Sequence, residues 1–158
     1  ASCLVGSEMC IRDSLDPEHS GINLFDNNWK IYSRNSGMTG HKISASADVH
    51  DSMITDGCRI KGTVKHSVLF AGVKVAEGAV VEDAVVMGGT TIERGAVVRH
   101  CIIAENVTIK ENAVVGAMPE GDEHGVATVG SGITIGEGAV IGPKAMVRNN
   151  VEGGEEQW

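Results

Sequence analysis

The strongest constraint on the fold is an internal repeat of 17 residues that runs three times, without a gap, from residue 64 to residue 114. The three copies read VKHSVLFAGVKVAEGAV, VEDAVVMGGTTIERGAV and VRHCIIAENVTIKENAV. Each copy divides into five, six and six residues, and an aliphatic residue opens each part. This spacing does not fit a helical stripe and is too long for strand alternation alone. It predicts a parallel β-helix in which each coil has three short strands.

The corners of the coils are visible in the columns of the aligned copies. Two columns contain only Gly and Asn, the residues that adopt left-handed backbone conformations at low cost, so they predict two corners with positive φ. The third corner holds the five-residue part and a column of small residues, as a tight inner corner requires. The Gly and Asn columns are Gly57, Gly72, Gly89, Asn106 and Gly78, Gly95, Asn112; the small column is Ser52, Ser67, Ala84, Cys101.

The composition agrees with an all-β fold of this kind. Aromatic residues make up 3% of the 158 residues and glycines number 21, so the core must consist of Val, Ile and Ala between many turns. Stacked coils lie about 4.8 Å apart, and about six of them make a prism roughly 30 Å long. Such a stack buries a continuous core that no single coil could bury alone.

The charge balance and the cysteines limit the partners and the compartment. The net charge of −8 opposes binding to a phosphate backbone, so no nucleic-acid partner is expected. No apolar run approaches the ~20 residues that a membrane span needs, so no membrane partner is expected either.

Without a signal peptide, Cys58 and Cys101 indicate a reduced, cytoplasmic protein. They fall on different corners, beyond the ~7 Å limit for a disulfide.

The chain divides into four segments. Residues 1–14 resemble one reading frame of a sequencing-library adapter, and we interpret them as a scar; a natural linker or short strand is the alternative. Residues 15–42, which contain Phe25 and Trp29, form an irregular strap or interdomain linker. The β-helix is expected over residues 43–151, and residues 152–158 form an acidic tail.

No residue is assigned a catalytic, cofactor-binding or metal-binding role. His66, Asp83 and His100 share one column, but two coils separate the histidines by about 9.6 Å, which is too far for joint ligation at ~2.1 Å. A solvated turn face is therefore expected. The repeat is interrupted at residues 116–128, where Asp122, Glu123 and His124 follow one another on an extruded loop. A mobile insert is the expectation for this loop.

The outer faces of the prism differ in polarity. One face carries apolar residues on four successive coils, and an exposed patch of that extent usually marks an interface. We expect this face to bind a catalytic domain or a neighbouring subunit. The alternative is that the strap covers it through Phe25 and Trp29. The residues of the face are Met53, Val68, Phe70, Val85, Met87 and Ile102.

Three stretches of the chain resemble one enzyme family. The strap LFDNNWKIYSRN, the first coils ADVHDSMITDGCRIKGTVKHSVLFAGVKV and the closing VGSGITIGEGAVIG are similar to the C-terminal part of bacterial glucose-1-phosphate adenylyltransferases (ADP-glucose pyrophosphorylases). The resemblance covers residues 15 to about 151. It implies a left-handed β-helix that supports tetramer assembly and the response to an effector.

In that family, ATP and glucose 1-phosphate are converted to ADP-glucose and pyrophosphate for glycogen synthesis, with Mg²⁺. The resemblance places this chemistry in an N-terminal domain whose motifs have no counterpart here, so the chain by itself is expected to be inactive. Two alternatives remain. One is a hexapeptide acyltransferase, for which His124 is a loose candidate for the catalytic histidine. The other is a β-helix scaffold without chemistry.

Overall fold

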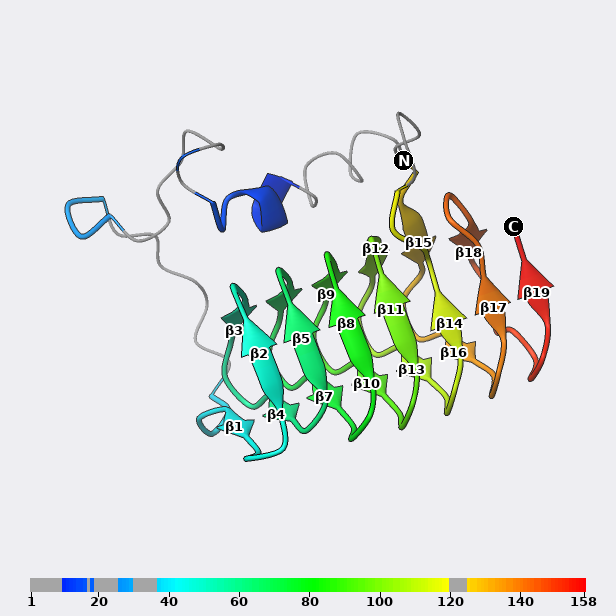
Figure 1. Ribbon diagram of the computed structural model, residues 1–158, viewed down its shortest axis with the longest axis horizontal. Coiled ribbons are helices and arrows are strands. Elements are labelled where there is room, and N and C mark those ends of the chain that lie inside the picture. The colour runs from blue at the N-terminus through cyan, green and yellow to red at the C-terminus, as the bar shows by residue number, and fades with distance from the viewer. Residues whose placement is uncertain (1–9, 17, 19–25, 30–36, 120–124) are drawn as a thin grey trace.

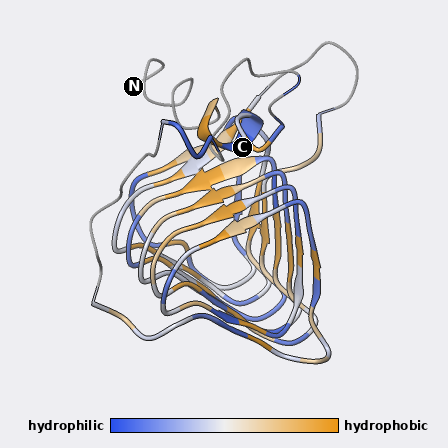
Figure 2. Cartoon of the chain, turned by 90° about the vertical axis from the view of Figure 1, so that its left-hand side faces the viewer, coloured by the Kyte–Doolittle hydropathy of each residue, from blue (hydrophilic) through white to orange (hydrophobic). Residues whose placement is uncertain are grey.

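A computed structural model describes residues 10–16, 18, 26–29, 37–119 and 125–158. The described residues contain 19 short strands, which stack in parallel into three sheets along the sides of a triangular prism (Figures 1 and 2). The sheets have six, seven and six strands. The chain therefore forms a β-solenoid of six to seven turns, which confirms the predicted all-β repeat fold.

Apart from β19 at the end of sheet B, each sheet takes every third strand of the chain. Sheet A contains β1 (Lys42–Ile43), β4 (Arg59–Ile60), β7 (Lys74–Val75), β10 (Thr91–Ile92), β13 (Thr108–Ile109) and β16 (Thr134–Ile135). Sheet B contains β2 (Asp48–His50), β5 (Thr63–Lys65), β8 (Val80–Glu82), β11 (Val97–Arg99), β14 (Val114–Val115), β17 (Val140–Ile141) and β19 (Glu156–Gln157). Sheet C contains β3 (Met53–Ile54), β6 (Val68–Leu69), β9 (Val85–Val86), β12 (Cys101–Ile103), β15 (Ala127–Val129) and β18 (Met146–Val147).

The register of the sheets follows the sequence repeat. Val81 pairs with Val98 and Ile92 pairs with Ile109, so residues one copy apart lie directly above one another. Equivalent residues therefore meet in the core, where each coil contributes Val, Ile, Leu or Ala side chains to one continuous cluster from Cys58 to Val151. No aromatic side chain belongs to this cluster among the described residues.

The predicted left-handed corners are confirmed. The two Gly and Asn columns have φ values from 57° at Asn112 to 77° at Gly72. The third corner differs from the expectation, because it also has positive φ. There the residue before the small column is left-handed, and no glycine is used. Asp and His are among the non-glycine residues that most often tolerate this region. These residues are Asp51 (43°), His66 (42°), Asp83 (51°) and His100 (43°).

Two segments beside the repeat also join the sheets. The loop predicted at 116–128 follows β14 and ends earlier than expected, because Ala127 and Thr128 belong to β15, where Ala127 pairs with Cys101. Asp122, Glu123 and His124 lie outside the described residues. In the segment 152–158, β19 pairs with β17 and adds a seventh strand to sheet B.

The segment before the solenoid contains a helical turn at residues 10–13. The Ser14 amide and hydroxyl both donate to the Cys10 carbonyl oxygen, at 3.0 and 2.6 Å. Trp29, in the predicted strap, is 80% exposed, and Phe25 lies outside the described residues. None of the helices in the described ranges combines the length and the apolar character that crossing a bilayer requires.

The cysteines that the structure describes are free thiols in contrasting environments. Cys58 and Cys101 are buried, and burial raises the pKa of both thiols; Cys10 is exposed. Because the thiolate is the reactive form, we expect iodoacetamide to label Cys10 in the folded protein roughly tenfold or more faster than either buried cysteine. Peptide mapping by mass spectrometry measures the three rates. Equal labelling before denaturation would contradict the burial of Cys58 and Cys101.

Candidate functional site

The sequence predicts one apolar outer face of the prism. In the structure, this face is the outer surface of sheet C. One outward ladder runs through Met53, Val68, Val85, Ile102, Thr128 and Met146, each in register with the next. Alternate residues point to opposite faces of a strand, and Leu69, Val86 and Ile103 belong to the core. The ladder side chains therefore point away from the core.

This surface is covered in its middle and open at its edges. Val85 is 0% exposed, and it forms a small cluster with Ile102 and with Val126 from the end of the loop. Val68 is also buried. Phe70 is 36% exposed, Met146 is 49% exposed, and Met53 and Met87 are half-buried. The sequence predicted the apolar character of the face, and the structure adds that its central residues do not contact solvent.

The helical turn at residues 10–13 lies over this side of the prism (Figures 1 and 2). Arg12 Nη1 donates a hydrogen bond of 3.3 Å to the Asp83 carbonyl oxygen and lies 3.4 Å from His100 Nδ1. Arg12 Nη1 is also 3.9 Å from the Asp83 carboxylate. The segment interpreted as a scar thus contacts the corner beside sheet C. The alternative prediction was that the strap covers sheet C through Phe25 and Trp29. Because Trp29 is exposed, it does not cover this sheet.

The corner row was predicted to be a solvated turn face, and this is only partly correct. His66 Nδ1 lies 2.6 Å from Asp83 Oδ1, and both side chains keep partial solvent contact. His100, however, is only 8% exposed, because it is at the corner that Arg12 contacts. Within the described ranges, no group of three or more His, Cys, Asp or Glu side chains is arranged to hold a metal ion.

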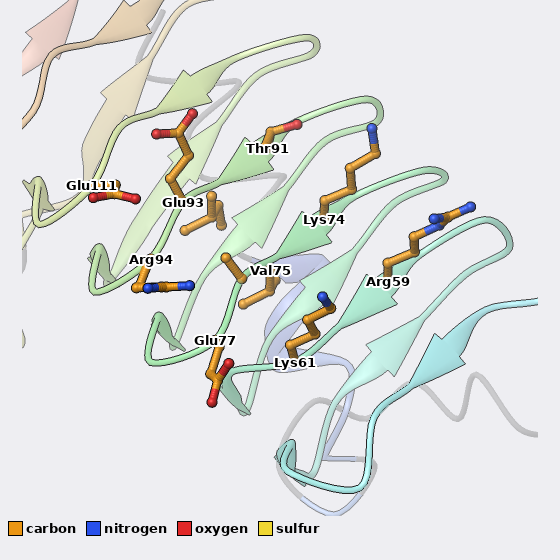
Figure 3. A pocket seen from close by; sticks show the side chains of 11 residues that line it. Arg59, Lys61, Lys74, Val75, Glu77, Thr91, Glu93, Arg94 and Glu111 are labelled. Atoms are coloured by element: carbon orange, nitrogen blue, oxygen red, sulfur yellow. The ribbon is translucent and has the colours of Figure 1, made fainter.

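The outer surface of sheet A is hollowed, with a volume of about 410 Å³ (Figure 3). Arg59, Lys61 and Lys74 lie at one side of the hollow, and the carboxylates of Glu93 and Glu111 lie at the other. Lys110 Nζ forms an ion pair of 3.3 Å with Glu93 Oε1. The sequence predicts a solvent face here but does not predict the hollow, which depends on the lengths and directions of stacked side chains.

Comparison with known proteins agrees with the repeat geometry. A family model described as GlmU-like, C-terminal hexapeptide matches residues 37–136. The chain belongs to this family. The match begins just before β1 and ends just after β16, so the family accounts for most of the solenoid.

Among curated proteins, this hexapeptide-family chain is similar to the C-terminal part of glucose-1-phosphate adenylyltransferases. It is 47% identical over 70 residues to the enzyme of Geobacillus stearothermophilus, an alignment that covers 44% of this chain. It is 48% identical over 67 residues to the enzyme of Bacillus mycoides (strain KBAB4), which covers 42%. The alignments span 18% of the length of each relative.

Among solved structures, the chain is similar to the acetyltransferase domain of PglB from Neisseria gonorrhoeae FA1090, in complex with acetyl coenzyme A. The TM-score is 0.50 at 18% identity, over 73% of this chain and 50% of that one. A second structure of the same domain gives a TM-score of 0.50 at 19% identity, over 72% and 52%. At these identities the likeness shows a shared β-helix fold.

Proposed function

We propose that this chain is the assembly and regulatory β-helix part of a cytoplasmic glucose-1-phosphate adenylyltransferase, and that it is inactive on its own. The observation that carries the proposal is the 47% identity over 70 residues to the Geobacillus stearothermophilus enzyme. The aligned part is 18% of that relative, so most of the relative has no counterpart in the alignment.

The reaction would be the transfer of an adenylyl group from ATP to glucose 1-phosphate, which gives ADP-glucose and pyrophosphate for glycogen biosynthesis. Mg²⁺ and ATP would bind in the N-terminal domain of the parent enzyme. The solenoid would contribute assembly, as a homo- or hetero-tetramer, and the transmission of an effector signal.

We further propose that sheet C is the side on which assembly takes place. The middle of this apolar surface is already buried, and among the residues predicted for the interface those available to a partner are Phe70 and the half-buried Met53 and Met87. A large side chain such as Phe70 at an open edge is the kind of residue that anchors protein interfaces. The partner would be the catalytic domain or a neighbouring subunit.

The test has a negative and a positive arm. The purified chain should form no ADP-glucose or pyrophosphate from ATP and glucose 1-phosphate with Mg²⁺. A chimera in which this chain replaces the matched part of the Geobacillus stearothermophilus enzyme should keep activity and oligomeric state, because the two solenoids would be equivalent. Both are measured by pyrophosphate release and by light scattering.

Two results would contradict the proposal. Turnover by the isolated chain would place the chemistry in the solenoid. Acetyl transfer from acetyl coenzyme A by the isolated chain, together with an inactive chimera, would favour the acyltransferase alternative instead.

A further inference from the structure

The first three strands of sheet A place three cationic side chains directly above one another. Lys42 in β1 is in register with Arg59 in β4, and Arg59 is in register with Lys74 in β7. The next residues after Arg59 and Lys74, Ile60 and Val75, point into the core, so the cations point outward. Lys61 projects from the same face. We refer to Lys42, Arg59, Lys61 and Lys74, all exposed, as the cation ladder.

The ladder is unfavourable for the fold by itself. Neighbouring strands lie about 4.8 Å apart, and like charges directly opposite each other on adjacent strands are destabilising. The same outward column continues through Thr91, Thr108 and Thr134, which are neutral and suit a β-strand. The column therefore contains cations only on its first three strands, and the fold itself does not require them there.

Two other stacked cations, Arg99 and Lys110, have carboxylate partners. Arg99 Nε lies 3.2 Å from Glu82 Oε2 on the coil before it, and Lys110 Nζ lies 3.3 Å from Glu93 Oε1. No comparable ion pair engages a ladder residue within the part of the chain that the structure describes. Three ladder residues also border the hollow of sheet A. The charge of the ladder is therefore available to a ligand.

We propose that the cation ladder binds a small linear polyanion of the oligophosphate class, aligned with the long axis of the prism. A guanidinium group binds phosphate oxygens through two parallel hydrogen bonds, and ammonium groups bind them as point charges. From Lys42 to Lys74 the ladder spans two strand spacings, about 9.6 Å, which suits a row of linked anionic groups.

The surroundings of the ladder limit the size of the ligand. The net charge of −8 opposes a long polyanion, whose remaining charges would lie over an acidic surface. Beyond the ladder, the hollow is lined by three carboxylates, Glu77, Glu93 and Glu111, and by one cation, Arg94, so an anion that extended past the ladder would meet a net negative charge (Figure 3). The site thus selects a short polyanion. This inference does not depend on the adenylyltransferase assignment.

The experiment is calorimetric titration of the full chain with tripolyphosphate and, separately, with inorganic phosphate. We expect tripolyphosphate to bind at least about tenfold more tightly than phosphate, because it contacts several cations at once. In the variant Lys42→Thr/Arg59→Thr/Lys74→Thr, which extends the threonine column of the same sheet, the affinity should fall at least about tenfold. The melting temperature without ligand should not fall, because repulsion has been removed.

The matched control is Lys65→Thr/Arg99→Thr/Arg148→Thr, which removes the same charge from sheet B and from the residue after β18, and it should keep the affinity for tripolyphosphate. Four results would overturn the proposal. They are no binding to the wild-type chain, an equal loss of affinity in both variants, a lower melting temperature in the ladder variant, and tighter binding of polyglutamate than of tripolyphosphate. The last result would identify the ladder as a surface for acidic polypeptides.

Discussion

Val85→Asp is expected to lower the free energy of unfolding by about 3–5 kcal/mol, because it places an uncompensated carboxylate in a fully buried position. Val85 lies between Val68 and Ile102 on the outer ladder of sheet C, and none of these side chains can pair with a charge. Urea unfolding followed by circular dichroism measures the loss. The size of this loss reports whether the centre of the face is covered in solution.

The loss should depend on pH in a defined direction. Burial raises the pKa of the introduced carboxyl group above its unfolded value of about 3.9. The variant should therefore be least stable, relative to the wild type, above the raised folded-state pKa. The deficit should shrink as the pH falls towards the unfolded-state pKa, since the group is then protonated in both states. A deficit that does not change with pH would contradict burial of the carboxyl group.

Two positions on the same surface serve as comparisons for Val85. Met146→Asp lies in the same outward column but at a half-exposed site, so it should change stability by less than about 1 kcal/mol.

Phe70→Lys tests assembly, because Phe70 lies at the open edge. If sheet C joins subunits, light scattering should show smaller particles for Phe70→Lys than for the wild type. Unchanged particle size would contradict the proposed interface.

Gly95→Val is expected to destabilise the protein by about 1–3 kcal/mol, because a β-branched residue would be forced to the φ of 70° found at this corner. A side chain at Gly95 also has little room. Its Cβ would overlap the side-chain oxygen of Asn112 on the next coil, and that amide would have to move. Chemical denaturation of the variant measures the effect.

Asn112→Gly is the matched control one coil further along. Asn112 has a φ of 57°, and glycine adopts this conformation without strain, so the change should be nearly neutral. If the two substitutions were equally harmful, the second column of Gly and Asn would not mark a corner.

The sequence was sufficient to predict the fold because one rule applies to each of the three contiguous copies of the repeat. The pairs Val81 with Val98 and Ile92 with Ile109 follow directly from the copies of the repeat. The left-handed third corner was not predictable in the same way, because Asp83 and His100 tolerate positive φ but do not require it. Glycine and asparagine columns identify such corners, whereas a mixed column of Asp and His does not.

The sequence predicted which outer surfaces of the prism are apolar, but it did not predict which of their side chains are accessible to solvent. Alternation along each strand indicated that Val85 points outward, and its register neighbours are apolar as expected. Val85 packs against Val126, which lies in the interruption of the repeat, and no periodic pattern reports such a contact. The placement of Arg12 beside Asp83 and His100 is equally non-periodic, since 71 and 88 residues separate these groups in the chain.

The offset of 17 residues between paired positions in the contiguous copies, such as Val81 with Val98 and Ile92 with Ile109, also determines how such a protein can change in length. A gene duplication that inserts one complete copy of the 17-residue unit would add a coil and leave every other inward side chain facing inward. An insertion of one residue inside a strand would instead turn its remaining side chains to the opposite face. The segment between Val115 and Ala127 shows the other tolerated outcome, in which extra residues leave the coil at a corner and the next strand resumes the register.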